Sequence, residues 1–109
     1  MSDAFDPTRD HRITREEAAT LVQAFQSGAE AGDHLASAFN RSAFEQLLVQ
    51  PGAAGIRIYR GQHADGSPTM VMVAVDAAGT DLDEPTCIFV QNTQDCPPYC
   101  AGSRLSNKS

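Results

Sequence analysis

The stretch Gly55-Ile56-Arg57-Ile58-Tyr59-Arg60-Gly61 decides the fold of this chain. It follows Pro51-Gly52, contains β-branched and aromatic residues, alternates in polarity and has a glycine at each end. This composition is typical of a pleated, half-buried β-strand. The residues before this strand carry helical patterns, and the residues after it carry strand and turn signals. The sequence therefore predicts helices first and a sheet second.

The first predicted helix begins at Thr14. Thr14 and Glu17 have the spacing of a capping box, in which each side chain accepts a hydrogen bond from the backbone amide of the other residue. An apolar stripe follows at i, i+3, i+4 and i+7, and it consists of Ala18, Leu21, Val22 and Phe25. We expect this stripe to face a core.

The second predicted helix ends at Pro51-Gly52, because proline lacks the amide that a helix needs and restricts the residue before it. Ser42 and Glu45 have the spacing of a second capping box. The sequence also allows a short first helical piece over Leu35 to Phe39.

Two further strands are predicted after Gly61. Asp65-Gly66 is a turn signal, so the first strand should fold back on Thr69 to Val75 as an antiparallel hairpin. The turn 76–79 then leads, through a polar connection, to a third strand over Thr86 to Gln91. The sequence thus predicts an α+β fold, in which two N-terminal helices are packed on one face of a small antiparallel β-meander of three or more strands.

Both faces of the second strand are apolar. Val71, Val73 and Val75 alternate with Met70, Met72 and Ala74. A sheet covered on one face should instead alternate between apolar and polar residues. We therefore expect a second copy, a protein partner or the terminal segments to cover the other face. The residues predicted for an interface are Met70, Met72, Arg57 and Tyr59.

The composition indicates one domain of 109 residues with a formal charge of −6. We expect a flexible arm over 1–12, a single domain over 13–101 and a flexible tail over 102–109. The acidic balance and the scattered basic residues argue against nucleic-acid and membrane binding. The N-terminus lacks the pattern of a signal peptide, so a cytoplasmic location is predicted, where cysteines are usually thiols or metal ligands.

The pair Cys96 and Cys100, separated by Pro-Pro-Tyr, is the main chemical lead. The two thiols could share a zinc ion with Cys87 and His63, cycle as a redox pair, or pack as small structural residues. His34 is a further candidate zinc ligand. The spacing alone leaves all three roles open.

A calcium site is a weaker alternative. Residues 6–17 place oxygen-bearing side chains at the spacing of an EF-hand loop, and these include Asp6, Thr8, Asp10 and Glu17. The position that requires glycine is His11, however, and the capping box explains Glu17 without calcium. No catalytic motif accompanies His11, His34 or His63, so we expect a protein that is not an enzyme.

The segments Pro51-Gly52, Gly55 to Tyr59 and Cys96 to Cys100 together resemble a set of small bacterial proteins of the Bacteroidetes type. Those proteins share the Pro-Gly-x-x-Gly-Ile-Arg-Ile-Tyr strand and the Cys-Pro-Pro-Tyr-Cys tail, and the likeness spans residues 13–105. The resemblance implies a bacterial, single-domain protein and no particular activity. The leading functional hypothesis is a small interaction or assembly module that forms a homo-oligomer or docks a protein partner, and the alternative is a zinc-binding or redox protein that uses Cys96 and Cys100.

Overall fold

The computed structural model describes residues 4–105 of the chain. The chain forms two compact units, each made of two stretches that are separate in sequence. One unit comprises Met1–Arg9 and Phe39–Thr93, and the other comprises Asp10–Ala38 and Gln94–Ser109. The boundaries predicted for an arm, a domain and a tail differ from these. Residues 1–3 of the predicted arm and 106–109 of the predicted tail lie outside the described residues.

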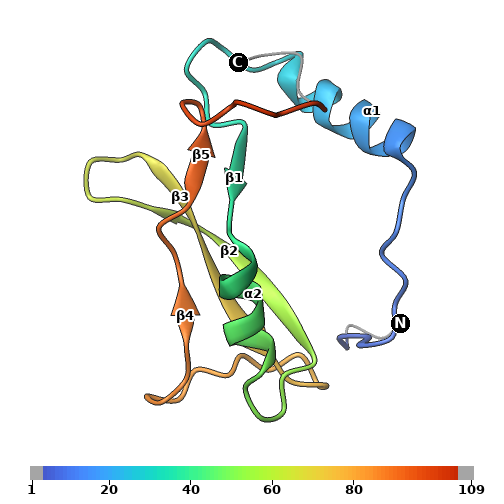
Figure 1. The fold of residues 1–109 in the computed structure, drawn as a ribbon, viewed down its shortest axis with the longest axis vertical. Helices are drawn as coiled ribbons and strands as arrows, with labels where there is room; N and C mark the ends of the chain where they lie inside the picture. Colours follow the sequence, from blue (N-terminus) through green and yellow to red (C-terminus); the bar gives the residue numbers. More distant parts are fainter. Residues whose placement is uncertain (1–3, 106–109) are drawn as a thin grey trace. The chain divides into compact units, whose positions relative to one another are not determined.

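The first unit contains the predicted meander (Figure 1). Strands β2 (Gly55–Gln62), β3 (Pro68–Val75) and β4 (Phe89–Val90) form an antiparallel sheet in that order. The register pairs Gly55 with Val75, and the predicted turn carries Gly66 at a φ of 91°, which a residue without a Cβ adopts readily. The hairpin prediction is therefore confirmed.

Strand β4 is shorter than the predicted third strand. The amide of Cys87 donates to the carbonyl of Glu84 at 2.8 Å and closes a turn there. The amide of Ile88 donates at 2.8 Å to the side chain of Gln50. A side chain therefore takes the place of a strand partner, and the sheet pairing begins only at Phe89.

Helix α2 (Arg41–Leu48) supplies the centre of the core in this unit. Its Leu47 is wholly buried and forms one cluster with Met72 and Ala74 of β3. Partly buried side chains surround this cluster, namely Phe39, Ala43, Ala53, Ile56, Leu82, Ile88 and Val90. The helix was predicted, but its N-cap is Asn40, whose side chain accepts from the amide of Ala43 at 3.1 Å. The capping box predicted at Ser42 is wrong, because Asn40 satisfies the first amides before Ser42 is reached.

The other face of the sheet is covered by the chain itself. The ring of Phe5 lies against Gly55 and Gly79, where an added Cβ would come within 3.0 Å and 2.5 Å of Phe5 atoms, respectively. Val73 and Val75 are buried on this face. The prediction of two apolar faces on β3 is confirmed, and an N-terminal residue provides part of the cover.

The second unit contains helix α1 (Arg15–Gln26) and a two-stranded antiparallel sheet. Strand β1 (Ala36–Ala38) pairs with β5 (Gln94–Cys96), as Figure 1 shows, so that Ala36 lies opposite Cys96. The short helical piece allowed over 35–39 is therefore wrong. The three residues of β1 are extended instead, and their partner β5 is too distant in sequence for a local pattern to predict the pairing.

Helix α1 begins as predicted. The side chain of Thr14 accepts from the amide of Glu17 at 3.0 Å, and the carboxylate of Glu17 accepts from the amide of Thr14 at 3.1 Å. Two of the four residues of the predicted apolar stripe are not buried, since Leu21 is 65% exposed and Phe25 is also exposed. The buried residue of the helix is the polar Gln26.

The fold is thus α+β, with two helices and two antiparallel sheets in the described residues. The arrangement with both helices on one face of the meander stays a prediction. None of the helices in the described part of the chain has the length and apolar character needed to cross a bilayer.

Candidate functional site

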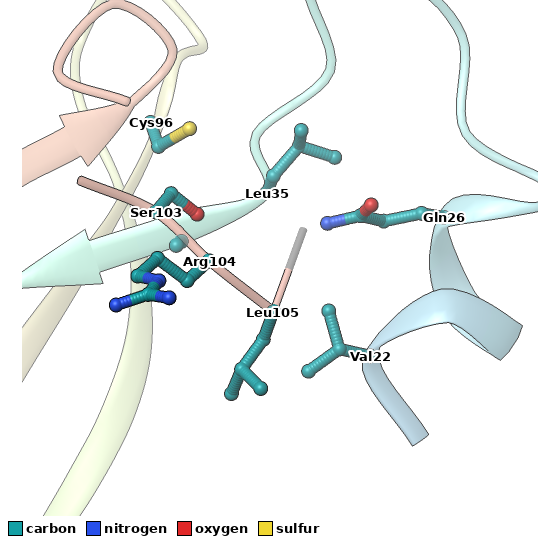
Figure 2. Close-up of a pocket in the computed structure, with 8 residues that line it drawn as sticks. Val22, Gln26, Leu35, Cys96, Ser103, Arg104 and Leu105 are labelled. Atoms are coloured by element: carbon teal, nitrogen blue, oxygen red, sulfur yellow. The ribbon is translucent and has the colours of Figure 1, made fainter. Parts of the chain in front are cut away.

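A pocket of about 290 Å³ lies within the second unit (Figure 2). Its volume is near the lower end of the range for small-molecule sites. Its walls combine apolar side chains with a few polar ones, and the lining residues are Val22, Gln26, Leu35, Ala36, Cys96, Ser103, Arg104 and Leu105. The pocket includes one of the predicted chemical residues, Cys96.

Three segments build the pocket. Helix α1 contributes Val22 and Gln26, which are four residues apart and therefore lie on the same side of the helix. The amide of Leu35 donates to the carbonyl of Cys96 at 2.8 Å, so the start of β1 and the end of β5 form one wall. Figure 2 shows residues 103–105 across from the two α1 side chains.

Cys96 and Cys100 are joined by a disulfide bond, with their Cα atoms 4.7 Å apart. The predicted cytoplasmic location favoured thiols or metal ligands over structural disulfides, and the spacing of this pair left its state open. Cys96 is 4% exposed and lines the pocket, while Cys100 is partly exposed. The two residues thus differ in exposure, and the buried one, Cys96, lines the pocket.

A polar network lies beside the pocket, on β1 and β5. The hydroxyl of Ser37 donates to Asp95 Oδ1 at 2.7 Å, and His34 Nε2 lies 2.8 Å from the same hydroxyl. The hydroxyl has one proton and gives it to Asp95, so Nε2 of His34 carries the proton of the second bond. His34 Nε2 is also 3.6 Å from Asp95 Oδ1.

This network differs from a catalytic Ser-His-Asp triad. In a triad the carboxylate binds the ring nitrogen remote from the serine, and the other nitrogen accepts the hydroxyl proton. Here one ring nitrogen faces both Ser37 and Asp95, and the hydroxyl donates to the carboxylate. The arrangement ties β1 to β5 and does not activate Ser37 as a nucleophile.

The predicted zinc ligands belong to different units. Cys87 and His63 belong to the first unit, whereas Cys96 and Cys100 belong to the second and are oxidised. Among residues 4–105, three or more His, Cys, Asp or Glu side chains do not gather at any point where they could hold a metal. A disulfide offers no thiolate, so zinc at these residues stays a prediction about the reduced protein.

The predicted calcium ligands are engaged in local contacts. Asp6 accepts from the amide and the hydroxyl of Thr8, at 2.9 and 2.7 Å. Arg12 binds Asp10 and holds the pKa of that carboxyl below its usual value. Glu17 completes the cap of α1. Calcium at these residues also stays a prediction.

The residues predicted for an interface lie on both faces of the sheet. Met72 is wholly buried in the core and offers no surface to a partner, which corrects its assignment. Met70 is partly buried on the same face as Met72. Arg57 and Tyr59 lie on the opposite face, and both side chains donate to the carboxylate of Asp81.

Asp81 has a perturbed environment. Its carboxylate accepts hydrogen bonds from the Tyr59 hydroxyl and from Arg57, and these contacts hold the pKa of Asp81 below its usual value. The same hydrogen bond raises the pKa of Tyr59, because the neutral phenol is the donor. The bond that Arg57 donates to Asp81 also raises the pKa of Arg57. This group closes one face of the sheet and lies in the unit without the pocket.

Several residues of the pocket were not predicted. Gln26, Ser103 and Arg104 have no motif around them, and their meeting depends on the pairing of β1 with β5. One signal was present in the sequence, since a polar residue stands at position 26 directly after the apolar stripe of α1. The comparisons with known proteins add no relative, because the chain matches no family model, no curated protein and no solved structure.

Proposed function

We propose that this chain is a thiol–disulfide exchange protein that works through Cys96 and Cys100. The observation that carries the proposal is a disulfide whose first sulfur-bearing residue lines a pocket and whose second is partly exposed. Exchange requires that a thiolate can reach one sulfur atom of the bond. Both a small molecule in the pocket and a larger thiol at the surface have such an approach.

The size of the loop supports an exchange role over a purely structural one. The bond joins residues four apart, and closing so short a loop removes little freedom from the unfolded chain. The loop-closure relation gives about 2 kcal/mol for a loop of about five residues, against about 3 kcal/mol for a loop of about 15. The bond therefore lies at the lower end of what disulfides contribute to stability.

The proposed reaction needs a thiol or dithiol as the co-reactant. Its thiolate attacks the sulfur of Cys100, the more exposed residue of the pair, and forms a mixed disulfide, and Cys96 leaves as a thiolate that takes a proton from water. A second thiolate then attacks the co-reactant's sulfur in the mixed disulfide and releases Cys100. Two thiols of the co-reactant are oxidised to one disulfide, and the protein gains two thiols.

The predicted cytoplasmic location fits this reaction. Disulfides in a reducing cytoplasm are usually transient and serve in catalysis or redox sensing. Trapping the thiols of cells that express the protein, by rapid acidification and alkylation, should show both redox forms of the Cys96–Cys100 pair. A pair that stays fully oxidised in a reducing cytoplasm would count against exchange.

The direct test is a redox titration of the purified protein in mixtures of reduced and oxidised dithiothreitol or glutathione. Alkylation and mass spectrometry then report how many thiols are present. We expect a reversible two-electron transition at Cys96 and Cys100, while Cys87 is alkylated throughout. A transition below about −300 mV, where structural disulfides lie, would overturn the proposal.

Zinc binding by the same pair is the other reading of this site. Native mass spectrometry of reduced protein, purified without chelator, distinguishes the two. One zinc ion per chain that is lost in Cys96→Ser would favour a metal site, whereas apo mass in the reduced form supports exchange.

A second candidate function is self-association, and the edge strand β2 favours it. Strand β2 has eight residues and pairs with β3 on one side only, within the described residues. Ile58, at its middle, is 54% exposed. Long exposed edge strands pair readily with strands of other chains. The assembly module predicted from the sequence would then use this edge instead of the buried faces of β3.

Light scattering at high micromolar concentration tests this second candidate. Ile58→Lys should convert a dimer to a monomer, since edge charges oppose pairing. Ile13→Lys is a matched control, because Ile13 is also 54% exposed but lies before α1. A monomeric wild-type protein, or equal effects of the two substitutions, would reject pairing through β2.

A further inference from the structure

The pocket beside the disulfide leads to an inference that rests on the proposed thiol–disulfide function. We propose that the pocket binds a small neutral molecule, mainly apolar and with one hydrogen-bonding group, and that it binds this molecule more tightly while the disulfide is formed. The proposal names both the ligand class and a regulation of the site. It follows from the lining of the pocket and from the way in which its third wall is attached.

The lining selects an apolar ligand. Val22, Leu35, Ala36 and Leu105 contribute apolar surface. An ammonium group placed among such side chains would lose its hydration without gaining a carboxylate partner in the lining, and a carboxylate would meet no cation on the α1 side of the pocket. Figure 2 shows the Arg104 guanidinium turned away from Val22 and Gln26, so the charged end of this residue is not aimed at the α1 side of the pocket.

The lining also provides neutral hydrogen-bonding groups. Gln26 is 2% exposed, and its side chain reaches from α1 toward the pocket in Figure 2. An amide can make up to four hydrogen bonds, so it can serve a ligand in addition to other partners. The hydroxyl of Ser103 stands on the opposite wall. A ligand with one hydroxyl or carbonyl group therefore suits this pocket best.

The disulfide fixes the third wall. Cys96 belongs to β5, which pairs with β1, whereas Ser103, Arg104 and Leu105 follow Cys100 in the chain. The amide of Ser103 donates to the carbonyl of Cys100 at 2.9 Å, a local bond that links the wall to the disulfide loop. The disulfide then links that loop to β5. Reduction removes this side-chain link and leaves the wall joined to β5 by the backbone of residues 97–102 and by the 2.7 Å bond from the amide of Tyr99 to the carbonyl of Asp95, so the wall is less restrained.

The two halves of the proposal are thermodynamically linked. If the oxidised protein binds the ligand more tightly than the reduced protein, the ligand must make the disulfide harder to reduce by the same factor. Bound ligand would thus lower the reduction potential of the Cys96–Cys100 pair, and reduction of the pair would lower the affinity for the ligand. A small molecule in the pocket would also cover Cys96, which leaves the partly exposed Cys100 as the point of attack.

The probe for the test is 4-fluorophenol, followed by fluorine NMR with the full-length protein. We expect one saturable site in the oxidised protein. In Cys100→Ser, which cannot form the bond, we expect the affinity to be lower by about fivefold or more, the smaller end of typical coupling factors. Equal affinities in the two proteins, with Cys100→Ser folded by circular dichroism, would overturn the redox control.

Matched substitutions on α1 locate the site. Val22→Phe should fill the pocket and abolish binding, whereas Leu21→Phe adds similar bulk at a neighbouring exposed position and should leave binding unchanged. Loss of binding in both variants, or in neither, would place the probe elsewhere.

4-Fluorobenzoate tests the ligand class, because it has the same ring with a charged group. Tighter binding of the benzoate would reject a neutral ligand and assign the recognition to Arg104.

Redox titrations of the protein with and without 4-fluorophenol separate this inference from the proposed function. A reversible transition that 4-fluorophenol does not shift would reject the coupled pocket and leave the exchange function intact. A pair that cannot be cycled at all would reject the exchange function. If the probe still bound in that case, the pocket would remain as a ligand site with a structural disulfide in its wall, and the redox control would be rejected.

Discussion

The Tyr59 hydroxyl lies 2.5 Å from Asp81 Oδ2, and the two residues approach each other across β3. Gly55 of β2 and Asp81 both pair with Val75 of β3, so they flank this strand from its two sides. Tyr59 therefore reaches over β3 to meet the carboxylate, and Arg57 does the same at 2.5 Å from Oδ1. A polar bridge thus crosses the face that also contains the buried Val73 and Val75.

This bridge predicts a loss of stability in acid. The pKa of Asp81 is lower in the folded protein than in the unfolded chain, where it is about 3.9. The contribution is complete above that value and is lost as the pH falls through the lower pKa of the folded state. The urea midpoint of the wild type should therefore decline more steeply below about pH 4 than that of Asp81→Asn. Asp83→Asn, a nearby exposed change, is the control, and parallel curves for wild type and Asp81→Asn would contradict the prediction.

The contact of Phe5 with Gly79 predicts a specific penalty for a methyl group. Gly79 has a φ of 85°, and an added Cβ would lie 2.5 Å from Phe5 Cβ. Gly66, with a φ of 91°, has open space at the same point. Gly66→Ala should cost about 1 kcal/mol of unfolding free energy through the backbone alone, and Gly79→Ala should cost more. The double variant with Phe5→Gly, which removes the Cβ that causes the clash, should recover the difference, and a failure to recover it would show that Phe5 does not pack there in solution.

Leu47 and Leu48 are adjacent on α2 but differ in burial. Leu47 is wholly buried against Met72 and Ala74, whereas Leu48 is 50% exposed. Leu47→Ala should lower the free energy of unfolding by about 2 to 5 kcal/mol, through lost burial and the cavity left behind. Leu48→Ala should have a much smaller effect. Equal losses in chemical denaturation would show that the helix is rotated from the orientation described here.

The position of the α2 cap gives a further prediction. Asn40→Ala should destabilise the protein by about 1 kcal/mol, because it removes the acceptor for the amide of Ala43. Ser42→Ala removes a hydroxyl that donates to Asn40 and accepts from no helix amide in the described contacts, so its cost should be smaller. The reverse order in thermal unfolding would restore Ser42 as the cap.

Local patterns in the sequence were sufficient for much of the fold. The capping box at Thr14, the turn at Gly66 and the alternation along β3 depend on neighbouring residues, and the structure contains all three. The cap of α2 was placed two residues late, since Asn and Ser are similarly good caps and a downstream glutamate favoured Ser42.

The candidate site could not be predicted in the same way. Ala36 and Cys96 are opposite each other in a sheet of two short strands, and no local pattern specifies that pairing. Without it, Gln26 and Ser103 have no reason to share a pocket. The pair Cys96 and Cys100 was recognised because its spacing is visible, but its oxidation state depends on the fold and on the chemical environment.

The pairing of Ala38 with Gln94 also has a consequence for biosynthesis. Phe39–Thr93 lies between these two residues in the sequence. Most of the first unit is therefore synthesised after β1 but before its partner strand β5. A ribosome must translate the whole of that stretch before β5 exists. The unit that contains the disulfide can therefore be completed only after the intervening 39–93 segment has emerged.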